Sequence, residues 1–353
     1  MLTMTHRERV LASLQHRPTD RIPIAMVCSG INAPVYQELE SELRRTRGLT
    51  LEAYLDPLLD IRTVEPRYIG PALGVGEDIW GVVRAPVSYG LGAYDEIVRH
   101  PLGDAREPAD VARHRWPTTD WFDYSALEQA IEQANQGGER CLMISGGNPF
   151  ETSWYLHGFE RTLEDLALAP DLVQALMEQV TAFFLEHTRR QLEAARGRVD
   201  FVFTADDIGG QNGLLMSLNL WRKRIRPFHE ALNAVVHEFG AKVIYHSDGA
   251  VMEAASELAD MGIDVLQALQ FDARGMDPVR LKREMGDRLC FQGGISVQST
   301  LPFGTPEEVR REVRERIDVL GEGGGYILGP SHAIQAGTPV ANVLAMFDEA
   351  ARL

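Results

Sequence analysis

The chain has 353 residues, of which 44% are hydrophobic, and this is enough to build a large core. Its net charge of −16 excludes a protein that binds nucleic acid through a basic surface. The three cysteines, Cys28, Cys141 and Cys290, are far apart and form no CxxC pair, which argues against a disulfide framework and against a cysteine-rich zinc module.

The N-terminal stretch MLTMTHRERVLASLQHRP predicts a charged helix without the long apolar core of a secretion signal. No other stretch reaches the apolar length that is needed to span a bilayer. We therefore expect a cytoplasmic protein that has neither a membrane nor a nucleic acid as a partner.

Apolar segments that end in polar residues predict eight strands. In chain order they are RIPIAMVCSG (21–30), DIRTVEP (60–66), CLMISGG (141–147), DFVFTADD (200–207), KVIYHSD (242–248), DVLQALQ (264–270), LCFQGG (289–294) and YILGPSH (326–332). Because these runs do not alternate strictly, they are typical of parallel strands covered by helices. The stretch 74–119 is rich in Gly, Pro and Trp and predicts a loop or hairpin excursion.

Helical patterns lie between the later strands, at about 171–195, 220–239, 250–261 and 305–320. The last is the clearest, with Thr305 as N-cap, Pro306 in the first turn and an apolar stripe along one face. Strands and helices in this order predict an α/β fold, a (β/α)8 TIM barrel in which residues 1–353 form one domain. A doubly wound sheet is the alternative, but CSGINAP after the first strand is a poor phosphate loop.

The predicted strands end in polar residues near Ser29, Ser145, Asp206, His246, Gln270, Gly294 and His332. Chemistry in such a barrel takes place at the carboxyl ends of the strands, so we expect one lined cavity there. The candidate catalytic residues are Glu151, Asp206, Asp207 and His332. The candidate substrate-binding residues are Cys28, Asn148, Gln211, Gln270 and Gln292. Asp206 and Asp207 alternate faces, so only one of them should point inward, and the helical His229 is interpreted as a surface or packing residue.

His246 and Asp248 lie two apart and therefore share a face of their strand. Together with His332 they are a candidate site for zinc or another divalent metal, which Asp206 or Asp207 would complete. The same side chains would also serve as proton donors and acceptors without a metal.

The motifs HSDG, FQGGISVQSTLPFGTPEEV and PSHAIQAGTP resemble those of the uroporphyrinogen decarboxylase superfamily, and the resemblance runs from RERVLASLQHRPTDRIPI almost to the C-terminus. That superfamily includes uroporphyrinogen decarboxylases and the zinc-dependent methyltransferases of corrinoid pathways. The resemblance implies a (β/α)8 barrel with its site in the mouth.

Two departures from the superfamily bear on function. Uroporphyrinogen decarboxylases carry an RQAGRY-type segment after the first strand, whose arginines hold substrate carboxylates. Here VCSGINAPVYQELE stands in that place, without an arginine before Arg44. Of the zinc ligands of the methyltransferase branch, His246 matches the histidine, while Asp248 and His332 stand where cysteines are expected.

Three hypotheses follow. The first is a methyltransferase or demethylase that passes a methyl group from a small substrate, such as a methyl ether or methylamine, to a corrinoid protein. This chain has no DxHxxG loop of its own, so a partner would carry the cobalamin. The second is a metal-free decarboxylase of a small cyclic acid or porphyrinogen, and the third is a non-catalytic barrel that binds a small ligand. A homodimer is left open.

Overall fold

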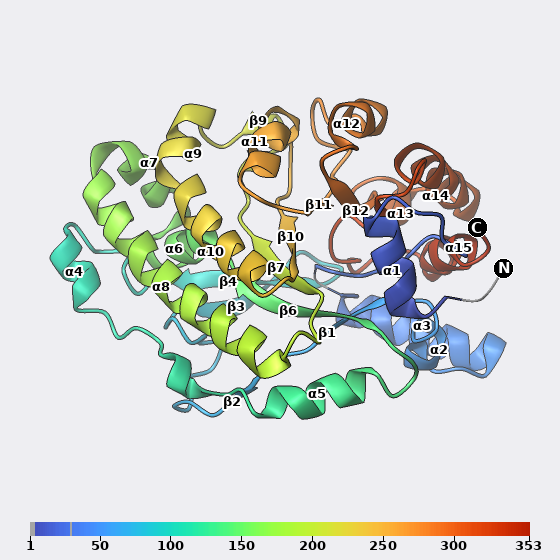
Figure 1. The fold of residues 1–353 in the computed structure, drawn as a ribbon, viewed down its shortest axis with the longest axis horizontal. Coiled ribbons are helices and arrows are strands. Elements are labelled where there is room, and N and C mark those ends of the chain that lie inside the picture. Colours follow the sequence, from blue (N-terminus) through green and yellow to red (C-terminus); the bar gives the residue numbers. More distant parts are fainter. Residues whose placement is uncertain (1–3, 29) are drawn as a thin grey trace.

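A computed structural model describes residues 4–28 and 30–353. Its centre is a curled sheet of seven parallel strands in the order β1-β6-β7-β10-β11-β12-β13, with helices on the outside (Figure 1). The strands of this sheet are β1 (Ile61–Thr63), β6 (Cys141–Gly147), β7 (Phe201–Ala205), β10 (Lys242–His246), β11 (Val265–Ala268), β12 (Cys290–Ile295) and β13 (Tyr326–Pro330). The predicted α/β class is therefore confirmed.

The helices come mainly after the strands that they cover. They are α1 (His6–Leu14), α2 (Ala33–Arg47), α3 (Leu51–Leu55), α4 (Pro108–Ala112), α5 (Ala126–Ala134), α6 (Pro149–His157), α7 (Phe159–Leu168), α8 (Pro170–Ala195), α9 (Leu218–Arg224), α10 (Arg226–Glu238), α11 (Ala255–Asp260), α12 (Pro278–Met285), α13 (Thr300–Phe303), α14 (Pro306–Leu320) and α15 (Val340–Ala350), with short 3-10 turns η1 (Thr119–Trp121) and η2 (Met252–Ala254). Within the described residues, no helix combines the length and apolar character needed to cross a bilayer.

The predicted helix at 305–320 is confirmed with its cap. Thr305 accepts a hydrogen bond from the backbone N–H of Glu308, and the Glu308 side chain accepts one from the Thr305 N–H in return. The helix predicted at 220–239 is instead two helices, α9 and α10, which meet at Ile225. Pro227 is the reason, because a proline within a helix cannot donate the backbone hydrogen bond that would continue the preceding turn.

The stretch 74–119 contains the antiparallel hairpin of β3 (Val83–Ser88) and β4 (Ala93–Arg99). These two strands form a sheet of their own, apart from the main sheet, and Val83 of β3 also bridges to Glu77. The remaining short strands form two further pairs, β2 (Arg67–Tyr68) with β5 (Phe122–Asp123), and β8 (Gly209–Gly210) with β9 (Gly213–Leu214).

The opening segment is not the regular strand that was predicted. Only Ile24 forms a parallel bridge, to Leu328 of β13, and Ser29 lies outside the described residues. Leu328 donates its N–H to the Pro23 carbonyl at 2.8 Å, and Asp60, next to β1, donates its N–H to the Ile24 carbonyl at 2.8 Å. Residues 22–27 therefore lie between the two edge strands of the sheet.

The interior of the curled sheet is filled by alternate residues of the strands. In β10, Ile244 belongs to an apolar cluster with Phe201 and Val265, while Val243 and Tyr245 belong to the larger cluster on the helix side. His246 is two residues beyond Ile244 and thus shares its inward face. His246 therefore lies at the mouth of an interior that is otherwise apolar.

The buried carboxylate of Asp60 joins three segments of the chain. It accepts hydrogen bonds from Arg9 Nη1 at 2.6 Å and from Arg21 Nη1 at 2.8 Å. It also contacts His6 Nδ1 at 2.7 Å and accepts the Ile24 N–H at 2.8 Å. Burial acts to raise the pKa of Asp60, but the hydrogen bond from His6 and the charges of Arg21 and Arg9 outweigh it, so this pKa lies below its ordinary value.

Replacing Asp60 with Asn should remove the negative charge that compensates the buried guanidinium group of Arg9 and the partly buried one of Arg21. We expect Asp60→Asn to lower the free energy of unfolding by about 3–5 kcal/mol at pH 7, measured by urea denaturation. Because the pKa is lower in the folded state, the wild-type contribution is complete above the unfolded value of about 3.9 and is lost as the pH falls through the folded value. The difference between the two proteins should therefore shrink in acid.

The matched control is Asp287→Asn, at an exposed position between α12 and β12, which should change stability by less than about 0.5 kcal/mol. Equal stabilities of wild type and Asp60→Asn would show that the cluster does not hold the fold together.

Candidate functional site

The carboxyl ends of the sheet strands open into two neighbouring cavities. The His246 cavity, of about 630 Å³, is lined by His246 and Asp207 together with Cys28, Asn148, Glu151, Trp154, Tyr155 and residues of β4. The Phe303 cavity, of about 500 Å³, is lined by Phe303 and Asp248 together with Gln270, Ser331 and residues 335–338. Tyr94 and His332 line both cavities, so the two meet at these side chains.

His246 ends β10 and is held in one orientation. Its Nδ1 lies 2.5 Å from Oε1 of Gln267, the residue opposite it in β11. Because an amide oxygen only accepts, Nδ1 donates this hydrogen bond, and in the neutral ring Nε2 keeps its lone pair. This Nε2 lies 3.6 Å from the Asp207 carboxylate. The histidine is thus prepared to act as a ligand or as a base.

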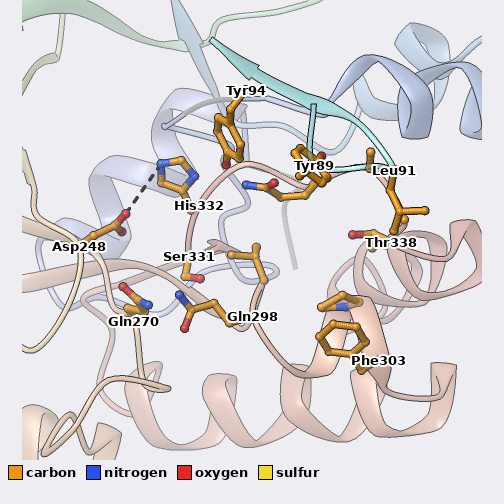
Figure 2. Close-up of a pocket in the computed structure, with 15 residues that line it drawn as sticks. Tyr89, Leu91, Tyr94, Asp248, Gln270, Gln298, Phe303, Ser331, His332 and Thr338 are labelled. Carbon is orange, nitrogen blue, oxygen red and sulfur yellow. Dashed lines mark ion pairs between the residues drawn. The ribbon is translucent and has the colours of Figure 1, made fainter. Parts of the chain in front are cut away.

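Asp248 and His332 lie beside each other at the boundary of the two cavities. His332 Nε2 is 3.8 Å from Asp248 Oδ2, the ion pair drawn in Figure 2. The Asp248 N–H donates to Asp207 Oδ1 at 2.7 Å. Burial raises the pKa of Asp248, and His246 acts against this shift.

The glycine of the HSDG motif is required by a close backbone approach. Gly249 has φ +81°, and a Cβ there would lie 2.6 Å from the carbonyl carbon and oxygen of Gly209. Its N–H also donates to Gln270 Oε1 at 2.8 Å. The turn after Asp248 is therefore fixed against two neighbouring segments.

Two groups of side chains could each hold a metal ion. Their members are Cys28, His246 and His332 in one group and Asp207, His246 and Asp248 in the other, with potential ligand atoms within 4.8 Å of one another in each. The predicted trio of His246, Asp248 and His332 is divided between these groups. Imidazole nitrogen and thiolate sulfur suit zinc, and the free Nε2 of His246 suits either set.

The sequence predicts Cys28 only as a substrate contact. In the structure it also lies close enough to His246 and His332 to be a metal ligand. Sequence reasoning gave no sign of this role, because residue 28 is more than 200 positions from both histidines and forms no spaced motif with them. The other two cysteines lie in the interior, where burial raises the pKa of Cys290 to about 11 and that of Cys141 well above its ordinary value.

The neighbours Asp206 and Asp207 have different surroundings. Asp207 lines the His246 cavity, whereas Asp206 is fully buried and is not among the described residues that line either cavity. Asp206 accepts the N–H groups of Phe150 and Glu151 at 2.9 and 2.7 Å and contacts His229 Nε2. Burial raises the pKa of Asp206, and the charge of His229 acts against that shift. The geometry thus gives Asp206 the role of fixing the start of α6.

Glu151 sits in the first turn of α6 and reaches the His246 cavity. Its carboxylate accepts hydrogen bonds from Asn148 Nδ2 at 3.3 Å and from the Tyr155 hydroxyl at 3.2 Å. Burial raises the pKa of Glu151 well above its ordinary value, and the charges of Asp207 and Asp206 add to the effect. These surroundings therefore favour the protonated form of Glu151 more than those of an exposed glutamate do.

The three predicted glutamine contacts separate in the structure. Gln270 lines the Phe303 cavity, as Figure 2 shows. Gln292 is fully buried beneath the mouth and donates from Nε2 to the Ala25 carbonyl at 3.0 Å. Gln211 is exposed and pairs with Gln298 at 3.4 Å. Neither Gln292 nor Gln211 is among the described residues that line the two cavities.

The far end of the Phe303 cavity is apolar. Figure 2 shows His332, Asp248 and Gln270 at one end of this cavity and Phe303, Leu91 and Thr338 at the other. The side chains of Phe303 and Leu91 are 83% and 71% exposed, so this end faces solvent.

Comparisons with known proteins agree with this architecture. A family model described as uroporphyrinogen decarboxylase (URO-D) matches residues 102–353. The chain is 22% identical over 373 residues to a uroporphyrinogen decarboxylase of Coxiella burnetii, covering 97% of this chain and 93% of that one. It is 23% identical over 369 residues to a methylcobamide:CoM methyltransferase of Methanosarcina barkeri, covering 98% and 97%.

Among solved structures, a methyltransferase from Methanosarcina mazei superimposes with a TM-score of 0.69 at 20% identity and covers 99% of both chains. That likeness supports the fold alone, whereas the family model spans well over half of the sequence. The chain belongs to the uroporphyrinogen decarboxylase (URO-D) family.

Proposed function

We propose that the protein is a methyltransferase or demethylase that moves a methyl group from a small methylated substrate to a corrinoid carried by a partner protein. The observation that carries the proposal is the position of the ligand cluster between two cavities that share Tyr94 and His332. A transfer reaction brings two reactants to one centre, whereas a decarboxylation needs room for one. The methyltransferase named among the relatives adds support.

Charge in the His246 cavity argues against a porphyrinogen substrate with many carboxylates. Asp95, Glu96, Glu151 and Asp207 line the cavity. Arg84 is the single arginine among the described lining residues, which include no lysine, and it is paired with Asp78 at 2.7 Å. A polycarboxylate would meet like charges here without the arginine clamp that such ligands require.

A divalent metal such as zinc would fit the cluster, with His246 as its central ligand and Cys28 and His332 or Asp207 and Asp248 beside it. When bound, it would act as a Lewis acid on a donor heteroatom that keeps a lone pair, such as an ether oxygen. Gln267 orients His246 through Nδ1, which fixes the tautomer that a ligand needs. Glu151 would supply a proton to the demethylated product at the cavity wall.

The proposal includes the form of the barrel. Residues 22–27 lie between β13 and β1, and we infer that they act as the eighth strand of a (β/α)8 barrel whose regular pairing is limited to Ile24. Cys28 would then follow the carboxyl end of this strand, as the other site residues follow the ends of theirs.

A decarboxylase is the second candidate, because Glu151 has a raised pKa and lies in the same cavity as Asp207. A protonated carboxyl group could protonate the carbanion that is left when carbon dioxide departs. The uroporphyrinogen decarboxylases among the relatives also favour it.

One assay separates the two functions. The purified protein is incubated with reduced cobalamin and, in turn, with methyl ethers, methylamines and cyclic carboxylic acids. We expect methylcobalamin to form, detected by its absorbance, with at least one methyl donor. Release of carbon dioxide from an acid by metal-stripped protein, with no methylcobalamin from any donor, would overturn the proposal in favour of the decarboxylase.

Metal binding should depend on His246 and, less strongly, on Gln267. We expect His246→Ala to weaken zinc affinity by more than about 100-fold and Gln267→Leu to weaken it by about 10–100-fold, because the glutamine only orients the ligand. Competition with a chromogenic chelator measures both values. His237→Ala, on the outer helix α10, is the control and should bind zinc like the wild type. Unchanged affinity in His246→Ala would remove this histidine from the metal site.

Cobalt spectroscopy should identify which ligand group is used. If Cys28 binds the metal as a thiolate, the Co²⁺ protein should show a sulfur-to-cobalt absorption band in the near ultraviolet. We expect this band to disappear in Cys28→Ser and to persist in Asp207→Asn. Absence of the band in the wild-type Co²⁺ protein would instead favour the group of Asp207, His246 and Asp248.

A further inference from the structure

Part of the lining of the His246 cavity is an aromatic wall. Trp154 and Tyr155 on α6 and Phe159 on α7 line it together. The ring centroids of Trp154 and Tyr155 lie 4.3 Å apart at 76°, and those of Trp154 and Phe159 lie 5.3 Å apart at 76°. The edge-to-face arrangement holds the rings at steep angles to one another, so the wall combines ring faces and ring edges.

Acidic side chains line the same cavity as this aromatic wall. Asp95 and Glu96 come from β4, and Glu151 lies one helical turn before Tyr155 on α6. Arg84 does not offset them, because its charge is paired with Asp78 and its guanidinium lies 4.8 Å above the Tyr155 ring. This cation also shows that an aromatic face of the wall accepts a positive group.

A divalent metal in the ligand cluster would not reverse the sign of this cavity. Asp207 and Asp248 would offset both of its charges, and in the other group a Cys28 thiolate would offset one while the nearby Asp207 balances the second. Asp95 and Glu96 would still be uncompensated, since neither is paired with an arginine or lysine in the described part of the chain. Carboxylates beside exposed aromatic rings favour a cation, and a quaternary ammonium above all, over a neutral or anionic ligand.

We infer that the methyl donor is an N-methylated ammonium cation, bound between the aromatic wall and the carboxylates of the His246 cavity. This inference rests on the proposed function and names its substrate class. In the transfer the C–N bond breaks with its electron pair staying on nitrogen, which leaves a neutral amine. The ammonium nitrogen has no lone pair for a metal, so its own positive charge, and not a Lewis acid, makes the amine a leaving group. The electron pair of the reduced corrinoid of the partner protein forms the new bond to the methyl carbon.

Binding of choline tests the inference without methyl transfer. Titration calorimetry on the full chain loaded with zinc compares choline with 3,3-dimethyl-1-butanol, in which carbon replaces the charged nitrogen. We expect choline to bind about tenfold more tightly, within the range of a desolvated cation–aromatic contact. Equal binding of the two, or tighter binding of the neutral alcohol, would overturn the inference.

Variants locate the site. Trp154→Leu keeps apolar bulk but removes the ring face, and Glu96→Gln removes a charge from an exposed strand position at which folding is not at risk. Each should weaken choline binding several-fold and leave the alcohol unaffected. The matched controls on α2, Tyr36→Leu and Glu38→Gln, should change neither. Choline affinity that is unchanged in both cavity variants would place the cation elsewhere and contradict the inference.

The two proposals fail in different ways. If the cavity prefers the neutral alcohol but the protein demethylates a methyl ether, the cationic substrate is wrong and the methyl-transfer function stands. If the cavity selects choline but the protein forms no methylcobalamin from any donor, the cation site stands and the methyl-transfer function is wrong.

Discussion

The buried carboxylate of Asp60 is the interaction on which the arrangement of the barrel depends. It binds the N-terminal helix through Arg9 and the following segment through Arg21 and the Ile24 N–H. Because Ile24 bridges to Leu328, the same carboxylate fixes the distance between the first and last segments of the sheet. Cys28 follows four residues after Ile24, so its place beside the two histidines is a consequence of a charge cluster at the other end of the barrel.

A second buried carboxylate, that of Asp206, positions a segment at the mouth of the barrel. Asp206 accepts two N–H groups from the first turn of α6, where an anion is favoured by the helix dipole, and thereby positions Glu151. Its neighbour Asp207 accepts the Asp248 N–H and faces His246. Adjacent residues on a strand end thus divide the tasks, one holding a helix and the other lining a cavity, because alternation sends them to opposite faces.

The sequence predicts this structure where a repeating physical pattern exists. Apolar runs with polar ends identify the strands of the main sheet, and the N-cap and proline of Thr305 and Pro306 identify α14. The segment 21–30 reads as a full strand in the sequence, because composition does not reveal how many backbone pairs form. The break at Ile225 was missed because the apolar stripe continues across it.

The site is less predictable, because its members meet only through the fold. His246 and Asp248 share a strand face and are visible as a pair. Cys28 as a ligand requires knowledge of how the first and last segments of the barrel meet. Gln211 lies in the turn between β8 and β9 and points outward, whereas Gln292 lies within β12 and is buried beneath the mouth. His229 is a packing residue as interpreted, yet it is packed against Asp206, and no pattern on α10 indicates that contact.

The hairpin of β3 and β4 explains how one barrel can present two cavities. Its tip residues Tyr89 and Leu91 line the Phe303 cavity, Asp95 and Glu96 line the His246 cavity, and Tyr94 between them lines both. Because β3 and β4 pair with each other and not with the main sheet, changes in this hairpin leave the parallel strands and their ligands in place. The sheet therefore fixes the reacting centre, while an independent two-stranded element sets what can approach it and from which side. A family whose named relatives include both decarboxylases and a methyltransferase is consistent with this separation of centre and access.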